Sequence, residues 1–440
     1  MIKTSRLGRR SFLRWAGGAA AAGVVGVGGV GCRGLVPHTG SGNAKDLSIS
    51  WWAEGTLSNL HLDVLKQYQA SHDGVTVQPQ YQPLNGYDDK LSTELAGGNA
   101  PDIFQLRRQT FAEYISRGAV RQLDDLVPGT LPFDRLPEVL QAAAQYKGHW
   151  YAIPLGLATA PAVIGDKVVL RSFGIEAPKA DWTLADFESL LRTVHKRSGG
   201  RYFGSTDMSG SEVAITAFLA GADKLIFTDD GRPGFSRDDL SQWWQMWDRF
   251  RQDGLVPPMK VTAAGKGFTT DPLVKGTSAI TLTASSKGIN GLQPLVKHEL
   301  ELFSFPRRSE GGPTATSVGP IEWFALSSKL DGVKAQQAAD LAMFFVDNAK
   351  AIMTLNLAHG VPLFTARRRQ TYDQQSKINK LLYDNVQQIN DLGPAPVAAY
   401  PPGASELIAE LSNQNQLFAF GKVTLDQAVD AVFAAADRLL

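Results

Sequence analysis

The chain contains very little cysteine, with one residue, Cys32, among 440. A single cysteine excludes an intrachain disulfide and a zinc site built from several cysteines. Neither sign of charge is in large excess, since 44 basic and 43 acidic side chains give a formal net charge of +1. Residues 1–31 hold five of the basic side chains and no acidic one, so the remainder carries −4. We therefore expect no nucleic-acid partner, because that requires a basic surface.

Two common catalytic patterns are missing. The chain has no G-x-S-x-G nucleophile motif and no H-E-x-x-H zinc helix, and His298-Glu299 lacks the second histidine at the required spacing. We expect a protein that is not an enzyme and that holds no metal and no cofactor. Paired carboxylates for glycoside hydrolysis stay open, because their separation in space cannot be seen in a sequence.

The first 45 residues have the pattern of an export signal. Residues 8–14 (GRRSFLR) resemble a twin-arginine signal, and an uncharged Ala/Gly/Val run follows over residues 16–31. The run ends in Gly29-Val30-Gly31-Cys32, which resembles a bacterial lipobox. We expect a signal peptide over 1–31, lipidation at Cys32 and a polar tether over 32–45; a retained anchor helix is the alternative. Residues 29–34 also match G-x-G-x-x-G, but no strand precedes them and no helix follows, so we discard a dinucleotide site.

The rest of the chain alternates short apolar runs with amphipathic segments. A length of 440 residues predicts two lobes rather than one domain. Strands are expected at 47–52 and 75–77 and a helix at 57–70. This alternation predicts an α/β fold with mostly parallel sheets flanked by helices.

Residues 87–109 form the most informative unit. Tyr87, Leu91 and Leu95 recur every fourth residue, as on one face of a helix. Two glycines then predict the helix end, and residues 102–104 begin a buried strand. A polar cluster, 105–109, follows that strand. Ligands of open α/β sheets bind beyond the carboxyl ends of strands, so this cluster is a candidate ligand site.

Several segments resemble one protein family, in chain order. The stretch Leu-Ala-Gly-Gly-Asn-Ala-Pro-Asp-Ile (95–103) resembles the signature of extracellular solute-binding proteins of the maltose-binding-like family 1, which serve carbohydrate ABC importers. Residues 148–154 (GHWYAIP) resemble the segment by which such proteins leave the first lobe, and 360–362 (GVP) matches a later family motif. The resemblance extends from about residue 47 to the end.

This resemblance implies an architecture and a role. It implies a two-lobe periplasmic-binding-protein fold of type II, with residues 46–160 and 320–355 in the N-terminal lobe and 161–319 and 356–440 in the C-terminal lobe. It also implies a carbohydrate ligand held between the lobes, hinge closure, and delivery to an ABC permease with its cytoplasmic ATPase. We expect a monomer, lipid-anchored at the outer face of the cytoplasmic membrane. A glycan-active hydrolase and a glycan-binding lipoprotein without a transport role remain as alternatives.

The resemblance and the strand ends together give candidate ligand contacts. Asp102 has a structural alternative, capping its own turn, and Trp323 could belong to the core. Relatives often carry a ligand-stacking Trp where this chain has Ser285-Ser286, which predicts a less apolar pocket. A polar or charged sugar, such as an amino sugar or a phosphodiester, would suit the mix of nearby arginines with the carboxylates of Glu54, Asp102, Asp207 and Glu322. The expected contacts are Glu54, Gly55, Asn59, Asp102, Gln105, Arg107, Arg108, Asp207, Ser285, Ser286, Gly319, Glu322, Trp323 and Tyr400.

A tryptophan-rich segment at 243–250 could be mistaken for a sugar platform. Trp243, Trp247 and Phe250 are spaced to share one helical face. We therefore predict that they pack in a core.

Overall fold

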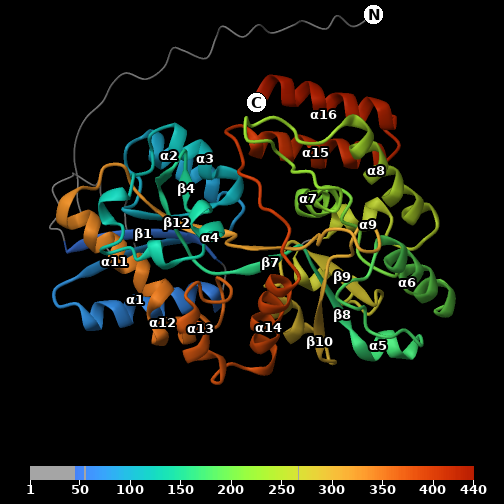
Figure 1. Cartoon of the computed structure of the whole chain (residues 1–440), viewed down its shortest axis with the longest axis horizontal. Helices are drawn as coiled ribbons and strands as arrows, with labels where there is room; N and C mark the ends of the chain where they lie inside the picture. The colour runs from blue at the N-terminus through green and yellow to red at the C-terminus, as the bar shows by residue number, and fades with distance from the viewer. Residues whose placement is uncertain (1–44, 54–55, 266) are drawn as a thin grey trace, which may run out of the picture. The chain divides into compact units, whose positions relative to one another are not determined.

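The computed structural model describes residues 45–53, 56–265 and 267–440. All of them belong to one compact unit, residues 41–440 (Figure 1). The predicted signal peptide, Cys32 and nearly all of the tether lie outside the described residues, and so do Glu54 and Gly55. Within the described ranges, no helix is both long enough and apolar enough to cross a membrane.

The first sheet contains five strands in the order β2-β1-β3-β12-β6. β1 pairs parallel with β2 and with β3, whereas β12 runs antiparallel to β3 and β6, so four of the five strands point the same way. This confirms the mostly parallel sheet predicted for the N-terminal part. The strands are β1 (Asp46–Trp52), β2 (Thr76–Gln82), β3 (Ile103–Arg107), β6 (Ala152–Pro154) and β12 (Glu322–Leu326).

The predicted helix, turn and strand around residues 87–107 are confirmed. α2 (Tyr87–Ala96) buries Tyr87 and Leu91 and ends at Gly97. Gly98 has φ +71°, a left-handed conformation that glycine adopts without steric cost, and β3 follows. The other helices beside this sheet are α1 (Thr56–Ser71), α3 (Arg108–Ser116), α4 (Glu138–Ala142), α11 (Gly332–Asp347) and α12 (Ala349–Leu355) (Figure 1).

α3 begins before the point that the local sequence pattern indicates. Thr110 and Glu113 have the spacing of a capping box, which is typical of a helix start. α3 instead begins at Arg108, and the structure shows no side-chain cap at its N-cap residue, Arg107. Thr110 lies inside the first turn, where its hydroxyl donates to the Arg107 carbonyl. β3 therefore continues into α3 almost directly.

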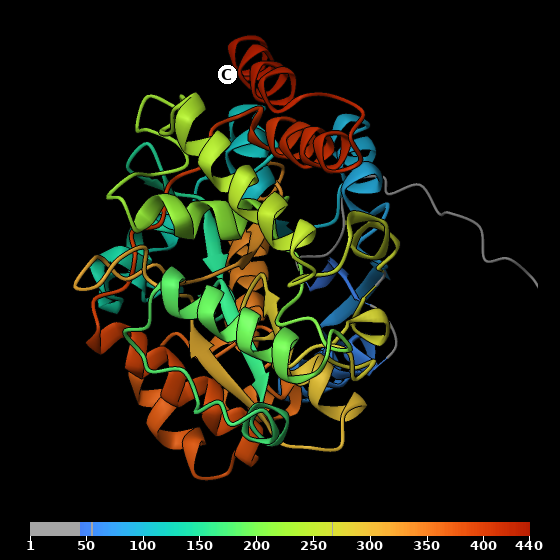
Figure 2. The same cartoon turned by 90° about the vertical axis from the view of Figure 1, so that its right-hand side faces the viewer.

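The second sheet differs from the prediction. It has three strands in the order β10-β8-β9, and β8 runs antiparallel to both neighbours, where a mostly parallel sheet was expected. Its strands are β8 (Ala162–Asp166), β9 (Ile280–Thr283) and β10 (Leu300–Ser304). Figure 2 shows this side of the molecule, with β8 in green and β10 in gold among helices. Strand direction depends on the connections between strands, which periodicity within each strand does not report.

Helices form most of the second half of the chain. Some of them begin with a capping box, such as Thr183 with Asp186 and Thr424 with Gln427, a spacing that is visible in the sequence. The helices are α5 (Lys167–Ser172), α6 (Leu184–Arg197), α7 (Glu212–Ala220), α8 (Arg237–Gln252), α9 (Met259–Ala264), α10 (Gly288–Leu292), α13 (Thr365–Tyr372), α14 (Lys377–Asp391), α15 (Ala404–Ala419) and α16 (Leu425–Leu439).

The chain passes between the two sheets three times. β7 (Ala158–Ala160) leads from the first sheet to the second, and β11 (Ser317–Gly319) returns and pairs antiparallel with it. A third connection comes after α12, where Val361 forms an isolated bridge with Leu157. A short hairpin, β4 (Gln145–Tyr146) with β5 (His149–Trp150), precedes the first passage.

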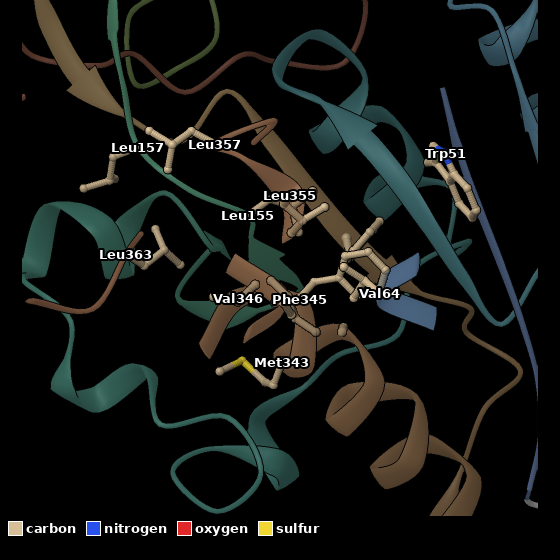
Figure 3. Close-up of a cluster of buried hydrophobic side chains, with 14 of the residues drawn as sticks. Trp51, Val64, Leu155, Leu157, Met343, Phe345, Val346, Leu355, Leu357 and Leu363 are labelled. Atoms are coloured by element: carbon tan, nitrogen blue, oxygen red, sulfur yellow. The ribbon is translucent and has the colours of Figure 1, made fainter. Parts of the chain in front are cut away.

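One apolar core surrounds the first sheet and extends to Ile164 of β8 and Leu300 of β10. Figure 3 shows part of it, where Val64 of α1 lies near Phe345 of α11 and Trp51 of β1 lies to one side. The second core contains the tryptophans of α8. Trp243, Trp247 and Phe250 expose at most 1% of their surface, which confirms the prediction that they are core residues. Burying each such side chain contributes about 1.5–3 kcal/mol.

Candidate functional site

A cavity of about 920 Å³ lies between residues of the two sheets. The first sheet contributes Trp52 at the end of β1, Gln105 near the end of β3 and Glu322 at the start of β12. The other wall comes from the end of β9 and from most of the segment that follows it, between residues 282 and 291, and from residues 355–359. This volume lies at the upper end of small-molecule sites, which measure about 300–1,000 Å³.

Much of the cavity wall is apolar and carries two aromatic rings. Trp52 is held edge-to-face against Tyr87, with ring centroids 5.4 Å apart. Phe268 is 42% exposed and packs against Gly291, where an added Cβ would lie 2.1 Å from the Phe268 ring. Flat aromatic faces beside polar groups are suited to a sugar ring, which has apolar C–H faces and polar hydroxyl edges.

A charged network forms the polar part of the wall. The Lys287 ammonium lies 2.7 Å from Glu322 Oε1, and His359 Nδ1 lies 2.8 Å from Glu322 Oε2. Gln105 Nε2 donates to the same Oε2 at 3.1 Å. The Glu322 and Lys287 side chains are 14% and 16% exposed, and His359 is 6% exposed. The carboxylate of Glu322 thus receives three hydrogen bonds from three different parts of the chain.

The hydrogen-bond partners assign the protonation states of the two histidines. His61 Nδ1 lies 2.8 Å from the Leu57 carbonyl, which only accepts, so Nδ1 carries a proton. Burial, together with the neighbouring His359, lowers the pKa of His61 to about 3, so its Nε2 is an acceptor. His359 Nε2, 2.9 Å away, must donate to it, while His359 Nδ1 donates to Glu322. His359 therefore carries both protons and is a cation.

Glu322 is ionised in this network. Burial alone would raise its pKa, but Lys287 and His359 outweigh that effect and lower the pKa to about 2. Asp271, which also lines the cavity, behaves differently. Burial raises its pKa, and its two oxygens accept from the Leu273 backbone N–H and the Thr281 hydroxyl, each at 2.8 Å.

A second polar cluster lies beside the cavity. It contacts Pro320, and the next residue, Ile321, lines the cavity. Arg108 donates to the Pro320 carbonyl at 3.0 Å, and its guanidinium lies 5.9 Å from the centre of the Tyr400 ring. The Tyr400 hydroxyl donates to Glu212 Oε1 at 2.8 Å, and Gln109 reaches the same oxygen at 3.4 Å. Burial raises the pKa of Glu212. This cluster joins α3 to α7 and to the loop before α15.

The structure brings only some of the predicted residues to these two places. Gln105, Ser285 and Glu322 line the cavity. Arg108 and Tyr400 belong to the second cluster. The loop residue Ser286 exchanges hydrogen bonds with Thr159 of β7, and Gly319 lies in β11. These last two hold the crossing strands together rather than line the cavity.

The remaining predicted residues that the structure describes lie elsewhere. Asn59 is exposed on α1, and Arg107 pairs with Asp88 of α2. Asp102 precedes β3, at the opposite end from the cavity, where it accepts from Ser48 and pairs with Lys334. The Asp207 carboxylate is fully buried against Arg251. Trp323 is 3% exposed and donates to the Ala143 carbonyl, as its core alternative anticipated.

Sequence reasoning missed several residues that line the cavity or lie behind its wall. Trp52 was read as part of a strand, although it is the last residue of that strand and lies at the expected ligand edge. Lys287 follows the serines that were chosen, so the segment was recognised but not its cation. His61 and His359 are 298 residues apart and carry no motif, so no signal in the sequence joined them. Across the described residues, no cluster of three or more His, Cys, Asp or Glu side chains could hold a metal ion.

Comparison with known proteins identifies the family. Residues 63–377 match the model of the bacterial extracellular solute-binding protein family. The diacetylchitobiose binding protein of Streptomyces coelicolor is 27% identical over 158 residues, which are 36% of each chain. The match to relatives from Brucella abortus and Brucella suis, at 23% identity, spans 44% of this chain and about half of theirs, 47%.

Solved structures share the fold over almost the whole chain. An extracellular solute-binding protein of family 1 from Alicyclobacillus acidocaldarius is 25% identical, with a TM-score of 0.67 over 90% of this chain and 98% of that one. A periplasmic oligogalacturonide binding protein from Yersinia enterocolitica, solved with saturated digalacturonic acid, has a TM-score of 0.76 at 17% identity, over 89% of this chain and 98% of that one. These matches confirm the two-lobe α/β fold. The chain belongs to the bacterial extracellular solute-binding protein family.

Proposed function

We propose that this protein captures a carbohydrate between its two lobes and delivers it to an ABC permease. The observation that carries the proposal is the cavity of about 920 Å³, which combines aromatic and aliphatic walls with the Lys287–Glu322–His359 network. A site of this kind holds a sugar by stacking on its C–H faces and hydrogen-bonding its hydroxyls. Proteins named for binding diacetylchitobiose and oligogalacturonides support a sugar ligand.

The lobe boundaries are part of the same proposal. Residues 46–160 and 320–355 would form one lobe, and 161–319 and 356–440 the other. The three passages between the sheets are consistent with a hinge at β7, β11 and the segment near Val361. The cavity would then open and close as the lobes rotate about these segments, as in other binding proteins of this kind. Gln105, Ser285 and Glu322 are the predicted contacts that we retain for the ligand, with Trp52 and Lys287 added.

The proposal predicts reversible sugar binding without turnover. Neutral oligosaccharides, amino sugars, acidic sugars and peptides would be screened by melting temperature and by intrinsic tryptophan fluorescence, since Trp52 lines the cavity. A ligand that binds only the native state raises the melting temperature. At a hundredfold excess over Kd it adds about 2.7 kcal/mol to the free energy of unfolding. Recovery of the intact sugar is expected. Steady consumption of a glycan would instead support the alternative of a hydrolase.

Localisation gives an independent prediction. If Cys32 is lipidated, the native protein should partition with membranes, and Cys32→Ser should move it to the soluble extracytoplasmic fraction while its sugar affinity stays unchanged. The acyl chains provide the membrane affinity, so their loss removes it. Fractionation of cells followed by immunodetection measures this. An unchanged membrane fraction for Cys32→Ser would contradict the lipid anchor and support a retained anchor helix.

A further inference from the structure

Among the described residues, the cation Lys287 has one carboxylate partner, Glu322, and shares it with a second cation. Glu322 Oε1 accepts from Lys287 at 2.7 Å, and Glu322 Oε2 accepts from His359 at 2.8 Å. Because the hydrogen bonds of His359 to His61 and Glu322 require both of its protons, the three side chains together carry one net positive charge. Burying an unbalanced charge is unfavourable, and a negative group placed beside it would remove that cost.

In the part of the chain that the structure describes, the carboxylates around this cluster are already paired. Both Glu322 oxygens receive hydrogen bonds, and so do both Asp271 oxygens. The two other carboxylates that suggested an amino-sugar site are paired elsewhere, Asp102 with Lys334 and Asp207 with Arg251. A ligand ammonium would therefore have to displace a protein donor before it could pair with any of these four groups.

Donors, in contrast, remain available at the cavity. The Lys287 ammonium has three N–H groups, and within the described part of the chain one of them is matched to an acceptor, Glu322. The Ser285 hydroxyl lines the same wall, and among the described residues it has no hydrogen-bond partner. The Asn290 side chain lies there too: its amide nitrogen can donate, and its buried Oδ1, which has no partner among the described residues, can accept from a ligand hydroxyl. A cation and neutral donors on one wall are complementary to a carboxylate.

We propose that the ligand is an acidic sugar, a uronate, whose carboxylate pairs with Lys287 beside the Lys287–Glu322–His359 cluster. This rests on the proposed function, since it names the class of sugar that the same cavity takes. Lys287 is then the specificity-determining residue: it distinguishes an acidic sugar from its uncharged counterpart. The Trp52 and Phe268 rings contact the uncharged part of the ligand, which acidic and neutral sugars share.

The test compares three disaccharides with the purified protein by isothermal titration calorimetry: digalacturonic acid, its dimethyl ester and diacetylchitobiose. The ester keeps the two sugar rings of the acid, adds two methyl groups and loses the charge. We expect digalacturonic acid to bind about 10- to 100-fold more tightly than the ester, as one charge-assisted hydrogen bond predicts. Lys287→Met should reduce that ratio to about one. Lys275→Met, at an exposed lysine outside the cavity lining, should leave it unchanged.

A second variant guards against misfolding, because Lys287→Met leaves Glu322 with one cation fewer. Lys287→Met combined with Glu322→Gln removes the cation without leaving a charged carboxylate unpaired, and it should also abolish the preference for the acid. Equal or tighter binding of the ester or of diacetylchitobiose would overturn the acidic-sugar proposal and leave sugar capture intact. A preference for the acid that survives both variants would overturn the role of Lys287. Binding of none of the three by folded protein would overturn both proposals.

Discussion

Glu322→Ala is expected to lower the free energy of unfolding by about 3–5 kcal/mol, the usual cost of removing one partner from a buried charge cluster. The substitution leaves the Lys287 ammonium and the His359 imidazolium close together with no carboxylate between them. It also leaves Gln105 Nε2 without its acceptor. Urea titration followed by circular dichroism measures the effect. This is a large loss for a protein whose net stability lies near 5–15 kcal/mol.

A surface ion pair provides the matched control. Glu299 pairs with Lys377, but these side chains are 72% and 76% exposed, so Glu299→Ala should change the free energy of unfolding by about 0–1 kcal/mol. A double-mutant cycle with Lys287→Met isolates the pair itself, because the double variant should be less destabilised than the sum of the two single variants. A loss below about 1 kcal/mol for Glu322→Ala would mean that water reaches the cluster and solvates its charges.

Much of the fold could be predicted because local signals agreed with tertiary structure. The helix at 87–96, the turn at Gly98 and the start of the strand near residue 103 follow from spacing, glycine and proline, and the structure contains all three. The strand continues to Arg107, however, so it includes part of the polar cluster that was expected after it. The capping boxes of α6 and α16 can likewise be predicted from the sequence, since the two partners of each lie within four residues of chain. The antiparallel pairing of the second sheet could not be predicted. Its strands come from residues 162–166, 280–283 and 300–304, and no local sequence pattern shows how such distant segments pair.

The site could be predicted only where it follows a strand. Glu322 is the first residue of β12, and Gln105 lies within β3, two residues before the partner of Glu322, so a search near strand ends found them. The same rule selected Asp207, whose carboxylate turned out to pair with Arg251 in the interior. A sequence shows that an acid is present but not which base it meets. The two-cation arrangement around Glu322 depends on four segments of the chain and has no local signature.

Acid should destabilise this protein through His61, a residue that sequence reasoning did not single out. Burial, and then the charge on His359, lower the pKa of His61 to about 3, against about 6.5 in the unfolded chain. Between these pH values the unfolded chain binds a proton that the folded protein does not. Stability is therefore greatest above pH 6.5 and falls as the pH falls, with a loss of about 2 kcal/mol from this residue by pH 5.

Between pH 7.5 and pH 5, the loss of stability caused by His61 can be measured apart from the loss caused by Glu322. The lowered pKa of Glu322, about 2 against 4.5, also makes the fold less stable in acid, but that loss begins only near pH 4.5. Urea titrations at pH 7.5, 6.5, 5.5 and 5.0 therefore report mainly on histidines. His61→Gln keeps an acceptor for His359 and removes the titration, so its stability should fall by about 2 kcal/mol less across this range.

The change in the free energy of unfolding with pH tests the protonation of His61 better than the free energy of unfolding at one pH. His61→Gln loses the packing of the imidazole on Trp51, whose ring centroid lies 4.9 Å away, so a lower stability at pH 7.5 is expected whatever its protonation. His149→Gln, at an exposed histidine, is the control and should keep the native slope. If His61→Gln keeps that slope as well, His61 does not stay neutral in the fold. The argument that places a second cation beside Lys287 would then fail, because it depends on His61 accepting a proton from His359.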